Sequence, residues 1–244
     1  MTALLRVEGL GKRFGGFVAL DSIDLDVQQG ERLGLIGPNG SGKSTLVNCI
    51  CGTLRNEIGR VRFGEEALDG LSAHERTRRG LARSFQLPRP FGSLSLAENV
   101  RIPILYTVNA RAGVGLGGGS IERRCLELLG EVGLADKADL RPRDLTQIEM
   151  RKLELARAMA TDPKLLIADE AMAGLSHAEV DEIIALLIRL NGQGVTVIMI
   201  EHIMRAVMEF SQRLAVLVAG RKIADGPPQE VVRNPEVVRA YLGE

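Results

Sequence analysis

The spacing of apolar residues changes along the chain. In the first 30 residues apolar and polar side chains alternate, as in the stretch "SIDLDVQ" at 22–28. This period of two predicts half-exposed antiparallel strands. Short continuous apolar runs then predict buried strands of a parallel sheet, at residues 32–36, 164–169, 195–200 and 214–218.

Helical patterns lie between these apolar runs. Ser176 and Glu179 have the spacing of a capping box and predict the start of a helix around Ile183 and Leu187. Alternation of strands and helices predicts an α/β core with a mostly parallel sheet. From about 88 to 160 the periodicity is helical instead, so we expect a single domain with a core at 1–87 and 161–244 and an inserted helical subdomain.

Glycines are concentrated in one part of the predicted helical subdomain. The stretch "RAGVGLGGGS" at 111–120 predicts a flexible connector. The N-terminal antiparallel strands form a further β subdomain in this interpretation. The fold class is therefore α/β, with two additions to the parallel core.

Composition excludes several protein classes. The chain has 244 residues with 31 basic and 31 acidic side chains, so no overall field attracts it to nucleic acid or to an anionic membrane. Cys49, Cys51 and Cys125 have neither metal-like spacing nor an even disulfide framework, and we expect them to be packing residues. Without a signal-peptide pattern or an apolar run of about 18 residues, the sequence predicts a reduced, cytosolic, soluble chain.

A glycine-rich motif follows the first buried run. "GPNGSGKST" at 37–45 matches Gly-x-x-x-x-Gly-Lys-Ser between a predicted strand and a predicted helix, the context that this motif requires. Glycines let successive backbone N–H groups surround phosphate oxygens, and the amino end of the helix adds partial positive charge. A P-loop NTPase core is therefore predicted, with nucleotide contacts from Gly37, Pro38, Asn39, Gly40, Ser41, Gly42, Lys43, Ser44 and Thr45.

Two acids end the second buried run. In "LLIADE" the carboxylate of Asp169 is placed to bind Mg²⁺ together with the Ser44 hydroxyl. Glu170 is then the group that orients or deprotonates an attacking water, a role typically worth about 10²–10⁴-fold in rate. The alternative for the two acids alone is a pair of solvated charges at a strand end.

Other classes of P-loop protein fit less well. The Asn-Lys-x-Asp motif of GTPases is absent, and neither the lid nor the acceptor pocket of a small-molecule kinase is identifiable. Phe14, Gln86 and His202 each permit a simple role, as a core aromatic, a surface amide and a helix cap. Their order along the chain, relative to the P-loop and the acids, is more informative.

That order resembles the nucleotide-binding subunit of an ATP-binding-cassette (ABC) transporter over nearly the whole chain. The resemblance implies binding of ATP and Mg²⁺ and stacking of adenine on Phe14. It implies a catalytic set of Lys43, Gln86, Glu170 and His202. It implies a metal-binding set of Ser44, Gln86 and Asp169.

A narrower likeness concerns the transported solute. The stretches "KRFGGFVAL", "RSFQLPRPFGSLSLAENV", "IEH" and "NPEVVRAYLGE" resemble an ATPase subunit of branched-chain amino acid importers. Importers of urea, amides or other small polar solutes have similar ATPase subunits and stay as alternatives. The resemblance implies transmembrane permease subunits as partners, a solute-binding protein as an indirect partner, and a peripheral location on the cytoplasmic face of the plasma membrane.

The signature segment of the family departs from its pattern here. Where the family has Leu-Ser-Gly-Gly-Gln, which contacts the γ-phosphate of ATP bound to the opposite subunit, this chain has Leu-Thr-Gln-Ile-Glu at 145–149. Thr146 and Glu149 have capping-box spacing, and the resemblance implies that they contact nucleotide. Without glycine, close backbone approach is poorer. Pairing with a sister subunit that retains both glycines predicts one strong and one weak ATP site; pairing with a second copy of the chain is the alternative.

Two rival functions are considered. A soluble cassette protein acting on nucleic acid or ribosomes finds its best support in the basic cluster at 76–83, but a solvated face explains that cluster as well. We therefore expect no nucleic-acid partner. A small-molecule phosphotransferase would transfer phosphate to an acceptor other than water.

Overall fold

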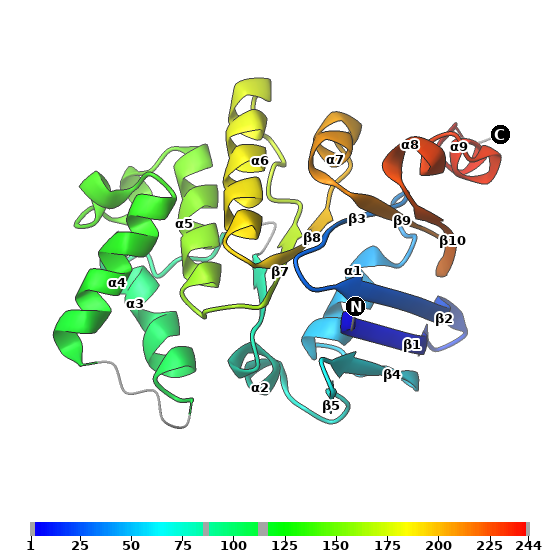
Figure 1. Cartoon of the computed structure of the whole chain (residues 1–244), viewed down its shortest axis with the longest axis horizontal. Coiled ribbons are helices and arrows are strands. Elements are labelled where there is room, and N and C mark those ends of the chain that lie inside the picture. The colour runs from blue at the N-terminus through cyan, green and yellow to red at the C-terminus, as the bar shows by residue number, and fades with distance from the viewer. Residues whose placement is uncertain (1–2, 85–87, 112–116, 243–244) are drawn as a thin grey trace.

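Two sheets organise the protein (Figure 1). The computed structural model describes residues 3–84, 88–111 and 117–242. The smaller sheet is antiparallel, and its order is β2 (Phe17–Gln28), β1 (Ala3–Phe14), β4 (Ile58–Phe63) and β5 (Glu66–Ala67). The larger sheet has the order β10 (Arg221–Gly226), β9 (Arg213–Val218), β3 (Arg32–Ile36), β8 (Thr196–Ile200), β7 (Leu165–Asp169) and β6 (Leu81–Ser84). The five strands from β9 to β6 are parallel, and β10 pairs antiparallel to β9.

Helices cover both faces of the larger sheet. α1 (Lys43–Cys51) and α2 (Ala73–Arg78) lie on the side of the small sheet, whereas α6 (His177–Gly192) and α7 (Met204–Phe210) lie on the other side (Figure 1). The chain ends with α8 (Pro228–Val231) and α9 (Pro235–Leu242). The helical subdomain contains α3 (Leu96–Pro103), a π-helical turn (Ile104–Val108), α4 (Gly118–Glu131), two 3₁₀ turns (Ala135–Lys137 and Pro142–Asp144) and α5 (Gln147–Met159).

The two faces of each buried strand enter different cores. Leu165 and Ile167 of β7 pack with α1 and the small sheet. Leu166 and Ala168 pack instead with α6 and the helical subdomain. Because successive side chains of a strand point to opposite faces, an unbroken apolar run is needed when both faces are covered. Burial on both faces explains the continuous apolar runs. The parallel pairing of the strands brings their carboxyl ends to one edge of the sheet.

The predicted fold class is confirmed. The P-loop core with its mostly parallel sheet, the N-terminal antiparallel subdomain and the inserted helices are all present. The subdomain boundaries at 87/88 and 160/161 stay a prediction. The glycine-rich connector was predicted too long, because α4 already begins at Gly118; residues 112–116 lie outside the described residues.

Two further observations concern the cysteines and the helices. All three cysteines are buried and free, as packing residues should be. Across residues 3–84, 88–111 and 117–242, no helix combines the length and apolarity required to cross a bilayer.

Candidate nucleotide site

The P-loop joins the central strand β3 to α1. Its first glycine, Gly37, has φ 154°, and a Cβ atom there would lie 2.1 Å from the carbonyl oxygen of Leu217. Gly42 has φ 104°, and its Cβ would lie 2.7 Å from the carbonyl oxygen of Ala19. Because neighbouring backbone closes on both positions, only glycine lets the loop turn tightly into the helix. The amino end of α1 is thereby aimed out of the sheet edge, where phosphate is bound in this type of loop.

Lys43 lies across the loop that precedes it. Its ammonium donates hydrogen bonds to the carbonyl oxygens of Gly37 at 2.8 Å and Pro38 at 3.1 Å, and to Ser41 Oγ at 3.5 Å. Burial lowers the pKa of Lys43, and the nearby carboxylates of Glu170 and Asp169 oppose that shift. The ammonium is therefore held over the P-loop by three oxygens, within the field of the two acids.

Asp169 ends β7 and is paired with an arginine. The residue is 7% exposed, and its Oδ2 accepts a hydrogen bond from Arg83 Nη2 at 2.5 Å. Arg83 lies on the adjacent strand β6, and its Nη1 donates to Asn48 Oδ1 of α1 at 2.7 Å. The guanidinium thus links the carboxylate of β7 to the helix that follows the P-loop.

Glu170 turns out of the sheet immediately after Asp169. Its backbone has φ 47°, which is uncommon for a residue with a side chain, and its N–H donates to the carbonyl oxygen of Ile200 at 2.9 Å. Strained residues of this kind persist where surrounding structure holds them. The hydrogen bond to β8 provides that restraint and directs the Glu170 side chain toward the P-loop.

These groups line two adjoining hollows. The first has a volume of about 820 Å³, and its wall includes Asp169, Glu170, Ser44, Thr45 and Asn48. The second has about 250 Å³ and contains the loop from Asn39 to Thr45. Phe14, Ser44, Thr45 and Glu170 line both, so the P-loop and the acids share one cleft, which is called the nucleotide cleft below.

Two aromatic rings border the nucleotide cleft. Phe14 and Phe17 pair across the β1–β2 turn and are 51% and 63% exposed. Lys12 Nζ lies 5.4 Å from the centroid of the Phe14 ring. Sequence reasoning found Phe14 and missed Phe17, although the pairing of the two in "FGGF" could have indicated it.

His202 is less closely associated with the cleft. It follows β8, the strand next to β7, and its side chain is 66% exposed and does not line either hollow. The preceding Glu201 is almost fully buried, and its Oε1 accepts a hydrogen bond from the Met172 N–H at 2.9 Å. Glu201 Oε2 lies 3.9 Å from His202 Nδ1. Burial raises the pKa of Glu201, and the Met172 N–H and the charge of His202 counteract this.

The capping box at the start of α5 forms as predicted. Thr146 Oγ1 accepts a hydrogen bond from the Glu149 N–H, and Glu149 Oε2 accepts one from the Thr146 N–H at 3.0 Å. Glu149 Oε1 also accepts a hydrogen bond from Lys137 Nζ at 2.6 Å. These contacts lower the pKa of Glu149, with the Lys137 hydrogen bond as the largest cause. Neither Thr146 nor Glu149 lines the nucleotide cleft of its own chain.

For two members of the basic cluster at 76–83, Arg76 and Arg83, the interpretation as a solvated face was wrong. Arg76 is 4% exposed and donates hydrogen bonds to the carbonyl oxygens of Cys49, Ile50 and Leu71. Arg83 is bound to Asp169 as described above. Sequence reasoning missed both roles; an arginine inside the buried stretch "LARSF" was the available signal. Gln86, predicted to bind metal and to act in catalysis, lies outside the described residues.

Comparison with known proteins identifies the family. The family model described as ABC transporter matches residues 20–173, which contain both the P-loop and the acids. The chain belongs to the ABC transporter family. A second model, described as branched-chain amino acid ATP-binding cassette transporter, matches residues 221–244 of this cassette.

Individual relatives extend over the full length of the cassette. It is 37% identical to the high-affinity branched-chain amino acid transport ATP-binding protein BraF of Pseudomonas aeruginosa, over 99% of this chain and 98% of that protein. A crystal structure of the ADP conformation of an ATP-binding cassette of an ABC transporter has 31% identity and a TM-score of 0.89, covering 100% of both chains. A dimeric post-hydrolysis cassette bound to ADP and phosphate has 26% identity and a TM-score of 0.81, covering 92% of this chain and 98% of that one. The chain is accordingly an ATP-binding ABC ATPase.

Proposed function

We propose that this cassette hydrolyses ATP to power an importer of branched-chain amino acids. The observation that carries the proposal is the shared cleft, in which the P-loop of α1 faces the acids at the end of β7. The full-length likeness to BraF and the match of residues 221–244 support the choice of cargo. The reaction is phosphoryl transfer from ATP to water, in which catalysis consists mainly of positioning and charge stabilisation.

The predicted site residues have separate roles in this proposal. Lys43 exchanges its loop carbonyl partners for the outer phosphates, and backbone N–H groups of the P-loop bind the remaining phosphate oxygens. Glu170, restrained by β8, orients and deprotonates the attacking water. His202 senses the γ-phosphate from the end of β8. Phe14, with Phe17 beside it, stacks on the base.

The oxygen donors of the cleft suit Mg²⁺. This ion prefers hard oxygen ligands and is usually bound by one or two carboxylates together with substrate phosphates. No group of three His, Cys, Asp or Glu side chains gathers anywhere in the described part of the chain, which agrees with such a sparse site. Ser44 and Asp169 would hold Mg²⁺, with Gln86 as a predicted third ligand. Bound there, the ion neutralises charge that develops on the transferred phosphoryl group.

Dimerisation completes the site in this proposal. Thr146 and Glu149 lie outside the cleft of their own chain, as residues that contact the nucleotide of an opposite subunit should. Each side chain already accepts a hydrogen bond from the backbone N–H of the other residue, so the start of α5 offers an anion fewer free donors than a glycine-rich signature does. We therefore infer that pairing with a sister subunit gives unequal sites. The strong site uses Lys43 and Glu170 of this chain.

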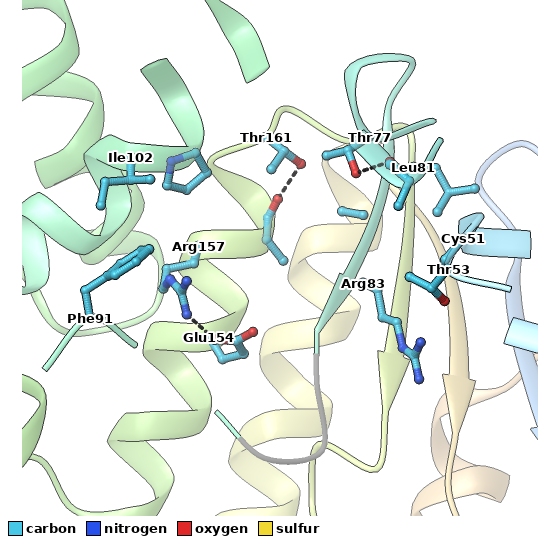
Figure 2. Close-up of a pocket in the computed structure, with 14 residues that line it drawn as sticks. Cys51, Thr53, Thr77, Leu81, Arg83, Phe91, Ile102, Glu154, Arg157 and Thr161 are labelled. Atoms are coloured by element: carbon cyan, nitrogen blue, oxygen red, sulfur yellow. Dashed lines mark hydrogen bonds and ion pairs between the residues drawn. The ribbon is translucent and has the colours of Figure 1, made fainter. Parts of the chain in front are cut away.

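A second cavity fits the docking of permease subunits. It has a volume of about 290 Å³ and lies between the core and the helical subdomain, with Phe91 and Ile102 on one side and Leu81 and Cys51 on the other (Figure 2). Asn99 holds Phe91 by accepting a hydrogen bond from its N–H at 2.8 Å and donating one to its carbonyl oxygen at 3.1 Å. We infer that a cytoplasmic segment of the permease enters this docking cavity. The cassette is then peripheral to the membrane, on its cytoplasmic face.

The inward contacts of the basic cluster argue against a nucleic-acid partner. Arg76 and Arg83 direct their guanidinium groups into the protein, and Arg79 pairs with Glu66. Phosphate contacts from accessible arginine and lysine supply most of the affinity in nucleic-acid binding. Importer function is thus favoured over the soluble alternative.

Reconstitution tests the proposal. The cassette, its sister subunit and the permease are placed in proteoliposomes with the solute-binding protein, and ATP-driven uptake of labelled leucine is measured. Glu170→Gln should abolish uptake and retain ATP binding, whereas Glu122→Gln on the exposed face of α4 should change neither. Stimulation of ATPase by urea or amides instead of leucine would show that the cargo is wrong. Full ATPase activity from the isolated chain would contradict the asymmetry of the dimer.

A further inference from the structure

One contact in the nucleotide cleft has no part in the mechanism above. Arg83 reaches across from β6, with its side chain 14% exposed, and binds the carboxylate of Asp169, whose side chain is 11% exposed. The same guanidinium donates its second hydrogen bond to Asn48 at 2.7 Å. Since the residue pair of Arg83 and Asp169 is 86 positions apart in sequence, the fold itself creates this arrangement.

The arginine is a cation on the carboxylate that Mg²⁺ is proposed to use. A charge-assisted hydrogen bond from an arginine is among the stronger polar contacts in proteins. A divalent ion that approaches Asp169 must share or displace that contact, and it also meets the repulsion of the guanidinium. Arg83 is therefore placed to weaken metal binding.

A charge count at the metal end of the cleft leads to the same result. Lys43 and Arg83 are two cations, and Asp169 and Glu170 are two anions, so their formal charges cancel. Such a site has little net attraction for a free divalent cation. A bound triphosphate adds several negative charges and reverses that balance, because opposite charges at a few ångströms attract strongly inside a cleft of low dielectric constant.

We propose that Arg83 is a positioning residue that makes metal binding depend on nucleotide, by acting as a built-in competitor of Mg²⁺ for Asp169. This inference rests on the proposed function, in which Asp169 is the metal carboxylate. In the absence of nucleotide, Arg83 keeps Asp169 compensated and fixed to α1 through Asn48. Once the triphosphate is bound, its charge outweighs the competition and the metal binds with it.

The location of Arg83 gives this competition a further consequence. Arg83 lines the nucleotide cleft and also the docking cavity, where Glu154 and Arg157 of α5 lie across from it (Figure 2). Glu154 Oε2 and Arg157 Nη1 are 2.7 Å apart, so the facing wall carries an ion pair of its own. A segment that enters the docking cavity therefore reaches the side chain that restrains the metal carboxylate.

Equilibrium binding of Mn²⁺, followed by the paramagnetic resonance signal of the free ion, tests the proposal without turnover. The wild-type chain should bind Mn²⁺ weakly alone, and the chain with a non-hydrolysable ATP analogue should bind more Mn²⁺ than the same analogue binds by itself. Arg83→Gln retains a hydrogen-bond donor for Asp169 and removes the charge. Its nucleotide-free affinity for Mn²⁺ should rise by about tenfold or more, the effect of removing one unit charge close to a divalent ion.

Two controls test whether the gain in Mn²⁺ affinity comes from loss of the Arg83–Asp169 contact. Asp169→Asn combined with Arg83→Gln should abolish the gain, because the released carboxylate is no longer present. Arg89→Gln removes an arginine charge from the same cleft without a described contact to Asp169, so its gain in affinity should be clearly smaller than that of Arg83→Gln. If Arg83→Gln does not fold, Asn48→Ala provides the second variant, since it removes the hydrogen bond that anchors the guanidinium to α1 and should raise the affinity by a smaller factor.

The outcomes separate the inference from the proposed function. The inference is overturned, and the proposed function is left intact, if folded Arg83→Gln binds Mn²⁺ without nucleotide as weakly as the wild-type chain does. Where Arg83→Gln does not fold, the same result in folded Asn48→Ala overturns it. A gain that persists with Asp169→Asn also overturns it. Both are refuted if Asp169→Asn alone leaves the affinity of the nucleotide-bound chain for Mn²⁺ unchanged, because Asp169 would not then be a metal ligand.

Discussion

Arg76 offers a sharp test of how the P-loop helix is anchored. Its guanidinium lies at the carboxyl end of α1, where it donates hydrogen bonds to the carbonyl oxygens of Cys49 at 2.7 Å and Ile50 at 2.8 Å, and to Leu71 at 3.1 Å. The last carbonyl groups of a helix have no partner within it and must be satisfied from outside. Arg76→Met retains most of the apolar stem and removes all three donors.

The expected cost follows from these contacts. A hydrogen bond from a charged group contributes about 1.5–3 kcal/mol, and a buried acceptor left without a partner costs about 1–3 kcal/mol. Burial lowers the pKa of Arg76, with Asp69 opposing that shift, which means that desolvating the guanidinium offsets part of the gain. We therefore expect Arg76→Met to reduce the free energy of unfolding by about 3 kcal/mol.

Urea denaturation followed by circular dichroism measures this loss. Arg78→Met is the matched control, because Arg78 lies two residues away on the same helix and is exposed. Arg78→Met should change stability by less than about 0.5 kcal/mol. A loss below about 1 kcal/mol in Arg76→Met, or equal losses in the two variants, would refute the reasoning.

Further predictions concern the nucleotide cleft and its surroundings. Lys43→Ala should eliminate ATP binding in a filter or fluorescence assay. The substitution removes the ammonium that holds three loop oxygens and that is proposed to bind the outer phosphates. Phe14→Ala and Phe17→Ala should each weaken ATP binding by about 1–3 kcal/mol, and the effect should be smaller for inorganic triphosphate, which has no base to stack. Burial raises the pKa of Glu201 above its ordinary 4.5. The free energy of unfolding therefore falls as the pH rises from the unfolded-state pKa through the higher folded-state pKa, because the buried carboxyl must then ionise. Glu201→Gln, which retains an acceptor for the Met172 N–H, should therefore raise the melting temperature at about pH 7 and do so less at about pH 5; a gain that grows on acidification would contradict this sign.

Much of the fold could be predicted because its signals are local. The run at 32–36 forms β3 with the predicted bounds, and the runs at 164–169 and 195–200 form β7 and β8 with one residue fewer. The capping boxes at Thr146 and Ser176 likewise join residues three apart and form as expected. The P-loop was also identifiable, since eight consecutive residues, 37–44, carry the whole motif. Such patterns can be recognised from neighbouring residues alone, without knowing which elements pack against them.

Apart from Phe17, which pairs locally with Phe14, the main contacts that sequence reasoning missed are long-range. Arg83 meets Asp169 only because β6 lies next to β7 in the sheet, with Arg83 in register with Ile167. Arg76 meets α1 only because α2 folds back under it. Charge patterning along the chain could not distinguish these buried arginines from exposed Arg78 and half-buried Arg79. The identity of a buried cation's partner is a property of the topology.

The changed signature segment follows the same division between local and long-range effects. Locally, Thr146 and Glu149 replace a glycine-rich start with a complete capping box, so α5 begins without distortion. The Glu149 carboxylate is neutralised by Lys137, which lies twelve residues earlier in the sequence and donates a hydrogen bond at 2.6 Å. This ion pair reduces the repulsion between the start of α5 and an anion. What is lost is free backbone: the Thr146 and Glu149 N–H groups are already donated to side chains within the cap. In the proposed unequal dimer, the second ATP site is weak because these donors are already engaged. Removing the Glu149 carboxylate would release one of them only by loosening the start of α5.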